Sequence, residues 1–123
     1  MSVAGAIPIL RLGSTLLVTL HVELHDEIAS QFQVDVLNTI QRTHGTELVI
    51  DISGLEMVDS YVARVLVETG TMASLMGART VLVGMRPEVA ATLVSMGYPM
   101  AGVKTALDLE AGLALLGKAL VDR

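Results

Sequence analysis

The amino-acid sequence predicts an α/β fold, in which a central mixed β-sheet packs against about four α-helices. Short runs of apolar and β-branched residues alternate along the chain with stretches whose apolar residues recur at helical spacing. The resulting order is ββαβαβα(β)α, and strands that alternate with helices indicate parallel pairing through right-handed crossovers. The 123 residues are predicted to form one domain that spans residues 1–123.

The first half of the chain predicts a hairpin, a helix and a buried strand. Residues 7–12 and 15–20 are apolar runs joined by a Gly-Ser turn, which indicates an antiparallel hairpin. Asp26 is the predicted N-cap of the first helix, and Gly45 ends its apolar repeat. Residues 48–52 are almost continuously apolar, which is typical of a strand buried on both faces.

The second half begins with a helix that is predicted to start at Ser60 and to end at Gly77, a residue type typical of C-caps. Residues 80–83 are predicted to form the next buried strand. The helix that starts at Ser60 is expected to bury one apolar stripe, which is made of Val62, Val65, Leu66, Met72 and Met76.

The remaining signals predict two more helices with a short strand between them. Pro87 suits the first turn of a third helix, which Gly97 ends. Residues 100–103 are predicted to be extended. Thr105 and Asp108 have the spacing of a capping box, which would open a last helix. That helix is expected to bury Leu109, Leu113, Leu116 and Leu120.

The composition excludes several classes of partner and chemistry. The net charge is −5 and only 8 residues are Lys or Arg, so nucleic acid and anionic membrane surfaces are poor partners. The absence of cysteine excludes thiol catalysis, and no apolar stretch reaches the ~18 residues of a membrane span. Residues 1–10 lack the positive region of a signal peptide, so a cytoplasmic protein is expected. Because 52% of the residues are hydrophobic, some apolar surface is expected to be covered in an assembly.

The most informative segment is residues 49–60, which runs from a buried strand through a short turn into a helix. In α/β sheets, binding sites lie where strands end and loops enter helices. Ser60 is placed at the helix N-cap, where its hydroxyl would accept a hydrogen bond from the N–H of Val62 or Ala63. A second interpretation is that Ser60 is a phosphoacceptor, because a helix N-terminus tolerates added negative charge.

Three carboxylates accompany Ser60 in this segment: Asp51, Glu56 and Asp59. A phosphate beside them would make the local surface strongly negative and would repel a docked partner. Paired carboxylates can also bind Mg²⁺ or act as general acid and base, which leaves a small phosphotransfer or hydrolase domain as an alternative. No Lys, Arg or His lies between them to complete such a site, so we expect no enzyme, no cofactor and no metal.

Residues 50–60, with their Ile-Asp-Ile and Val-Asp-Ser elements, and the helix that ends in Leu-Met-Gly-Ala resemble the STAS domain family. This family takes its name from sulfate transporters and anti-sigma factor antagonists, and the resemblance extends from residue 7 to residue 110. Within the family, residues 72–78 and the Gly-Met-Arg-Pro turn at residues 84–87 resemble the RsbS-type subgroup of bacterial stressosome proteins. The resemblance implies a single STAS domain.

The resemblance also implies a non-enzymatic scaffold subunit in stress signalling, which forms homo- and hetero-oligomers. Proteins of this subgroup assemble with larger RsbR-type STAS proteins and sequester a serine kinase of the RsbT type. The kinase is released when it phosphorylates the scaffold, and a phosphatase of the RsbX type resets the system. By this resemblance Ser60, which follows the matched Asp59, is the phosphoacceptor. The exposed face of the helix carries Tyr61 and Arg64, and these two residues are expected to form with Asp59 the partner-binding surface near Ser60.

Two further positions bear on the choice of subgroup. Thr92 lies where RsbR-type relatives can carry a second phosphoacceptor, which RsbS-type members are not expected to use. Sporulation-type antagonists continue the motif as Asp-Ser-Ser-Gly, whereas residues 59–62 read Asp-Ser-Tyr-Val. The alternative function is a stand-alone anti-sigma factor antagonist regulated by serine phosphorylation, which would be a monomer or a dimer.

Overall fold

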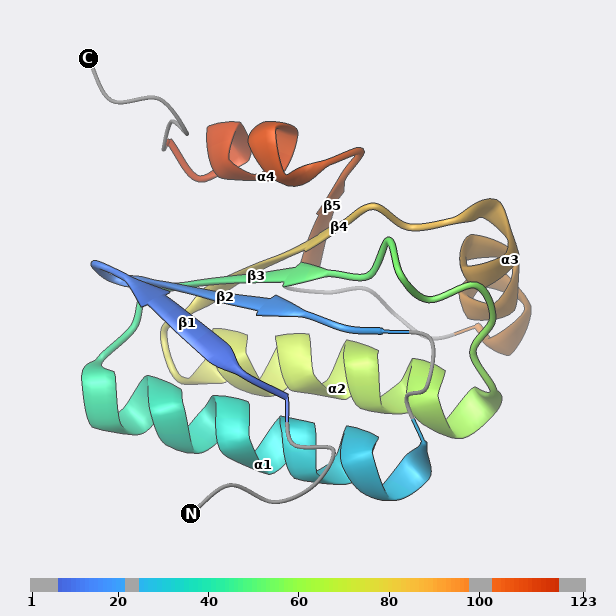
Figure 1. Cartoon of the computed structure of the whole chain (residues 1–123), viewed down its shortest axis with the longest axis horizontal. Helices are drawn as coiled ribbons and strands as arrows, with labels where there is room; N and C mark the ends of the chain where they lie inside the picture. Colours follow the sequence, from blue (N-terminus) through green and yellow to red (C-terminus); the bar gives the residue numbers. More distant parts are fainter. Residues whose placement is uncertain (1–6, 22–24, 98–102, 118–123) are drawn as a thin grey trace.

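The computed structural model describes residues 7–21, 25–97 and 103–117. Over these residues the predicted order of strands and helices is confirmed (Figure 1). The elements are β1 (Ile9–Leu12), β2 (Thr15–Thr19), α1 (Asp26–Thr43), β3 (Glu47–Asp51), α2 (Ser60–Leu75), β4 (Arg79–Val83), α3 (Pro87–Met96), β5 (Val103–Ala106) and α4 (Leu109–Leu115).

The strands form one sheet in the order β1-β2-β3-β4-β5, and the prediction of a mixed sheet is confirmed. β1 and β2 pair antiparallel through a turn at Gly13, whose φ of 63° lies in the region that favours glycine. The pairs β2–β3, β3–β4 and β4–β5 are parallel. The carboxyl ends of β2 to β5 therefore meet at one edge of the sheet, which is where α/β folds place their binding sites.

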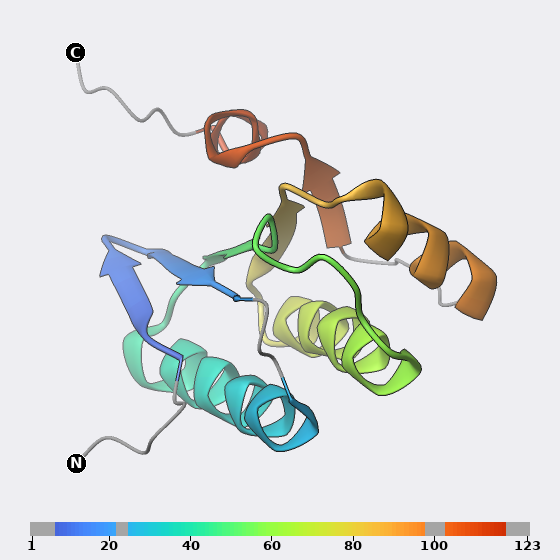
Figure 2. The same ribbon diagram turned by 45° about the vertical axis from the view of Figure 1, so that its right-hand side comes forward.

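Helices cover both faces of the sheet (Figure 1). α1 and α2 lie side by side on one face and α4 lies on the other, as Figure 2 shows from a second direction. In β3, the fully buried Leu48 and Ile50 pack on the side of α1 and α2, while the fully buried Val49 packs on the side of α4. The prediction of a strand buried on both faces is confirmed.

The start of α1 differs by one residue from the prediction. His25 occupies the N-cap position and Asp26 is the first helical residue, so the predicted cap at Asp26 is wrong. Asp26 still places a carboxylate in the first turn, where the helix dipole favours negative charge. At the other end, His44 adopts the left-handed conformation with a φ of 57°, and Gly45 follows it.

α2 buries the predicted stripe only over its first turns, at Val62, Val65 and Leu66. Met72 and Met76 are exposed, so their predicted place in the core is wrong. The core side of the last turns is formed instead by small residues, Gly70 and Ala73. A Cβ at Gly70 would collide with the side chain of Val103, so a glycine here lets α2 and β5 approach closely.

The helix ends marked by Gly and Pro are confirmed. Gly77 and Gly97 follow the ends of α2 and α3 with φ values of 91° and 69°, and Pro87 is the first residue of α3. α3 packs against α2, where Leu93 meets buried residues of that helix. None of the described helices is both long and apolar enough to cross a membrane.

The C-terminal elements differ from the prediction in two places. The last strand comprises Val103–Ala106, so the predicted extended segment is shifted, and residues 100–102 lie outside the described residues. Thr105 lies within β5, and Asp108 is itself the N-cap of α4, accepting from the Ala111 N–H at 2.9 Å. The predicted capping box is therefore wrong, because Thr105 pairs in the sheet. Leu120 lies outside the described residues.

Candidate functional site

The segment between β3 and α2 lies at the edge of the sheet where the parallel strands end (Figure 1). Two apolar side chains anchor it, since Ile52 and Leu55 are buried. The Ile52 N–H also donates to the Val83 carbonyl of β4 at 2.9 Å. Met57, by contrast, is 80% exposed two residues before the helix N-cap. The segment is thus anchored by buried side chains and exposes the apolar side chain of Met57 to solvent.

Close contacts fix the turn that directly follows β3. Asp51 Oδ1 accepts from the Ser53 N–H at 2.9 Å, and Arg86 Nε donates to the Ser53 carbonyl at 3.0 Å. A Cβ at Gly54 would lie only 2.8 Å from the Leu20 carbonyl oxygen, so glycine is required for the approach to the end of β2. The turn is therefore held by the chain that follows β2 and by the chain that follows β4.

Asp59, and not Ser60, caps α2. Asp59 has an extended backbone (φ −85°, ψ 177°), and its Oδ1 accepts from the Val62 N–H at 2.8 Å. Its carbonyl accepts from the Ala63 N–H at 3.0 Å. The two N–H groups assigned to the Ser60 hydroxyl by the sequence are thus bound by Asp59, and that prediction is wrong. Ser60 is the first helical residue and is exposed.

Tyr61 and Arg64 form a connected surface beside Ser60. The Tyr61 hydroxyl lies 2.9 Å from Ser30 Oγ, which joins the first turn of α2 to α1. The Arg64 guanidinium lies over the Tyr61 ring, 5.4 Å from its centroid, and Arg64 Nε lies 3.9 Å from Glu68 Oε2. The structure therefore brings Asp59, Ser60, Tyr61 and Arg64 together on the first two turns of α2, as expected from the sequence.

Thr92 lies on a different helix, and two other features of this region were not predicted from the sequence. Thr92 lies on α3, where its hydroxyl donates to the Glu88 carbonyl at 3.1 Å within the same helix. Arg86, which binds the Ser53 carbonyl, was not predicted because it lies 33 residues further along the chain. The exposure of Met57 was not predicted either, because a lone methionine in a turn carries no sequence signal of its environment.

The two carboxylates that could have supported an enzyme have structural roles. Asp51 accepts a hydrogen bond from the turn after β3, and Asp59 accepts one from the start of α2. Over the part of the chain that the structure describes, no group of three His, Cys, Asp or Glu side chains is placed to hold a metal ion. Both carboxylates therefore hold the backbone of the segment between β3 and α2.

The different roles of Asp59 and Ser60 give the first prediction. Asp59→Ala should lower the free energy of unfolding by about 1 kcal/mol, because the Val62 N–H loses its capping acceptor. Ser60→Ala should change it by less than about 0.5 kcal/mol, as is usual for exposed positions. Urea denaturation of the two variants beside the wild type measures both changes. A larger loss in Ser60→Ala than in Asp59→Ala would contradict the assignment of the cap.

Comparison with known proteins agrees with this fold. The model of the family described as "STAS domain" matches residues 6–110. The chain belongs to the STAS domain family. The four helices and the five-stranded mixed sheet agree with the fold of this family, and the fold expected from the resemblance is confirmed.

Two solved structures are similar to this chain over most of its length. One is a serine-to-glutamate variant of RsbS from Moorella thermoacetica, with 42% identity and a TM-score of 0.81, covering 90% of this chain and 94% of that one. The other is a chain in a structure described as the molecular architecture of the stressosome, a signal integration and transduction hub. It has 44% identity and a TM-score of 0.79, covering 89% of this chain and 96% of that one. The predicted likeness to RsbS is confirmed.

Among curated proteins, the chain is similar to RsbRA of Bacillus subtilis (strain 168), which is named an RsbT co-antagonist protein. The two are 32% identical over 87 residues, which cover 71% of this chain and 32% of RsbRA. The chain therefore spans about a third of the length of this relative and corresponds to a part of it.

Proposed function

We propose that the chain is a non-enzymatic stressosome subunit, which holds a serine kinase of the RsbT type and releases it when Ser60 is phosphorylated. The observation that carries the proposal is the position of Ser60. It is exposed, it is the first residue of α2, and it follows the anchored turn after β3. The likeness to RsbS and to an RsbT co-antagonist protein favours this function over other roles of STAS domains.

The position of Ser60 allows a phosphate to be added without disturbing the fold. A phosphate contributes about −1.5 to −2 charges, and the positive end of the α2 dipole stabilises negative charge at this point. Arg64 lies one turn further along the helix, where a side chain at spacing i+4 can meet a group on Ser60. The phosphate would compete with Glu68 for Arg64, so phosphorylation changes the charge and contacts of the surface.

The same surface has the composition of a docking site. Met57 contributes an exposed apolar side chain, Tyr61 contributes an aromatic ring, and Arg64 contributes a cation that lies on that ring. Methionine, tyrosine and arginine are enriched in protein–protein interfaces relative to other surfaces. Ser60 lies among these side chains, so a phosphate there would lie at the interface with the kinase.

Assembly with RsbR-type STAS proteins needs a second surface, and the hairpin offers one. Leu10 and Leu12 of β1 are 57% and 61% exposed. They pair with Leu17 and Thr15 of β2, so they lie on the face of the sheet that carries α4. α4 packs over β3, β4 and β5, which leaves these leucines uncovered. We assign this surface, the hairpin face, to contact with another STAS domain.

The second prediction concerns the modified residue. After incubation with ATP and an RsbT-type kinase, intact-mass analysis should find one added phosphate, and peptide mapping should place it on Ser60. Ser60→Ala should incorporate none. Thr92→Ala should incorporate as much as the wild type, because the Thr92 hydroxyl is hydrogen-bonded to the Glu88 carbonyl within α3. Phosphate found only at Thr92, or undiminished incorporation in Ser60→Ala, would refute the proposal.

The alternative function, a stand-alone anti-sigma factor antagonist, differs in its assembly. Such a protein would remain a monomer or a dimer when mixed with an RsbR-type protein, whereas the proposed subunit should enter a large complex with it. Light scattering of the mixture after size-exclusion chromatography separates the two functions. This measurement does not depend on whether Ser60 is phosphorylated.

A further inference from the structure

The turn between β4 and α3, which reads Gly-Met-Arg-Pro at residues 84–87, lies against the segment that leads to Ser60. Pro87 is explained by its place as the first residue of α3. The arginine is not explained in this way, because Arg86 occupies the N-cap position of α3 without a side-chain hydrogen bond to the helix. Its side chain is used elsewhere, at the turn that follows β3.

Gly84 lets the turns after β3 and β4 approach closely. Its φ is 77°, and a Cβ at this residue would lie 2.7 Å from the Ser53 Cβ. The Ile52 N–H donates to the Val83 carbonyl at 2.9 Å, so the chain enters both turns side by side. A side chain at position 84 would therefore push the two turns apart.

Arg86 fixes this approach with a hydrogen bond. Its Nε donates to the Ser53 carbonyl at 3.0 Å, although the arginine itself is exposed. Met85 is half-buried and packs against the same buried cluster of α2 and α3 side chains as Val58, which lies two residues before Ser60. The turn after β4 thus binds the start of the segment and packs on the cluster that supports its end.

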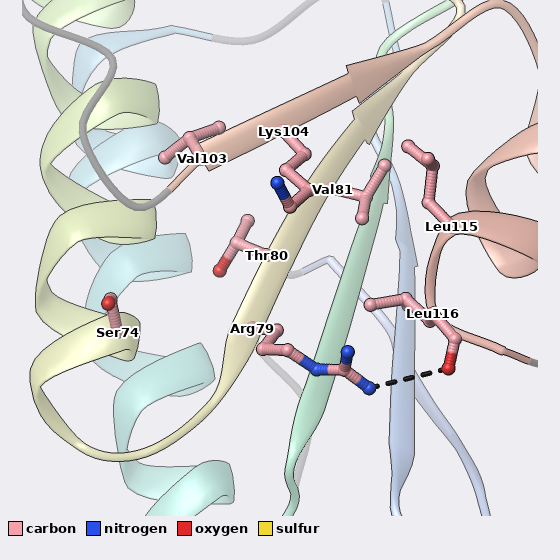
Figure 3. Close-up of a pocket in the computed structure, with 8 residues that line it drawn as sticks. All are labelled: Ser74, Arg79, Thr80, Val81, Val103, Lys104, Leu115 and Leu116. Atoms are coloured by element: carbon pink, nitrogen blue, oxygen red, sulfur yellow. Dashed lines mark hydrogen bonds between the residues drawn. The ribbon is translucent and has the colours of Figure 1, made fainter.

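Arg79, at the other end of β4, makes a similar bond away from the sheet edge that carries Ser60. Its Nη2 donates to the Leu116 carbonyl at 3.3 Å, as Figure 3 shows, and lies 3.0 Å from Oε2 of the buried Glu47. An arginine near each end of β4 therefore binds a main-chain carbonyl of another part of the fold. Of the two, Arg86 is the one that holds the segment before Ser60.

We propose that Arg86 is a positioning residue for the phosphorylation of Ser60. By holding the Ser53 carbonyl, it keeps the segment between β3 and α2 in the conformation that the kinase binds. The inference rests on the proposed function and adds to it a residue from another part of the chain. Without the bond the turn after β3 would open locally, so only a fraction of the molecules would present Ser60 correctly. The apparent affinity falls by that fraction, whereas the reaction in the bound state is unchanged.

Phosphorylation kinetics of Arg86→Gln test this role. With a purified RsbT-type kinase, Arg86→Gln should raise KM about fivefold and leave kcat unchanged, because one hydrogen bond of an exposed group contributes roughly this factor. Its melting temperature should stay within about 2 °C of that of the wild type, as is usual for exposed positions. An unchanged KM would overturn the inference and leave the proposed function intact. Absence of phosphate on Ser60 of the wild type would instead overturn the proposed function, and the inference with it.

Hydrogen exchange distinguishes positioning from direct contact with the kinase. The Leu55 N–H donates to the Ile52 carbonyl at 3.0 Å, within the turn that Arg86 holds. In the free protein, Arg86→Gln should speed exchange at the Leu55 amide about fivefold and leave exchange in α1 unchanged. A raised KM without faster exchange at Leu55 would show that Arg86 contacts the kinase itself and would overturn the positioning role.

Two arginine variants are the controls for charge and for stability. Arg42→Gln removes the same charge from the exposed end of α1 and should change neither KM nor the exchange at Leu55. Arg79→Gln removes the ion pair of the buried Glu47, so it should lower the melting temperature and still leave KM unchanged. A fivefold rise of KM in either control would show that lost charge or lost stability is sufficient, and would overturn the role of Arg86.

Discussion

Phosphorylation of Ser60 should weaken binding of the RsbT-type kinase about a hundredfold, and Ser60→Asp should weaken it about tenfold. The phosphate adds nearly two negative charges at an interface that already contains the carboxylate of Asp59. Juxtaposed like charges cost several kcal/mol at an interface, and about 3 kcal/mol corresponds to a hundredfold change in affinity. Aspartate adds only one charge, so its effect should be smaller.

Calorimetric titration of the kinase into each form of the protein measures this effect. Ser74→Asp is the matched control, because it makes the same exchange at an exposed position near the other end of α2. It should leave the affinity unchanged. Raising the salt concentration should restore part of the affinity lost in Ser60→Asp, since exposed charges are screened.

Two results would contradict the switch. Equal weakening by Ser74→Asp would show that added charge acts anywhere on the helix. Loss of the folded state in Ser60→Asp would show that Ser60 acts through stability. The second result is not expected, because negative charge is favoured at the first residue of a helix.

The fold could be predicted from the sequence wherever the signal is local. Gly13 fixes the hairpin turn, Pro87 begins α3 and Gly97 ends it, and each of these requires only the conformation of one residue. Met72 and Met76 were placed wrongly because helical spacing gives the direction of a side chain but not the neighbour that covers it. Whether that side of α2 is covered depends on the close approach of β5, which comes later in the chain.

In the candidate site, too, local features could be predicted from the sequence, whereas contacts between distant residues could not. Ser60 was found because the sequence passes from a buried strand to a helix within a few residues. The cap was assigned to Ser60 rather than Asp59 because both residue types cap helices well, and only the backbone conformation decides between them. The Arg86–Ser53 and Tyr61–Ser30 hydrogen bonds join residues that are 33 and 31 positions apart, so no local pattern could reveal them.

Exchange of both hairpin leucines for aspartate, in Leu10→Asp/Leu12→Asp, should abolish assembly with an RsbR-type protein. Each leucine that is buried in an interface contributes about 1.5–3 kcal/mol, and a carboxylate in its place also has to be desolvated. The double variant should therefore lose a factor of at least about 1,000 in affinity and remain a small species in light scattering. Its fold should persist, because both side chains are largely exposed in the domain itself.

The control for this variant is Leu75→Asp, which changes an exposed leucine at the end of α2, away from the hairpin. It should assemble as the wild type does, so that a loss of assembly in the double variant can be assigned to the position of the two leucines in the hairpin. Circular dichroism should show the same unfolding transition in both variants. Phosphorylation of Ser60 provides the second control, since the hairpin face and the Ser60 surface lie on different elements. The double variant should still be phosphorylated by the free kinase, and full assembly of this variant would refute the role of the hairpin face.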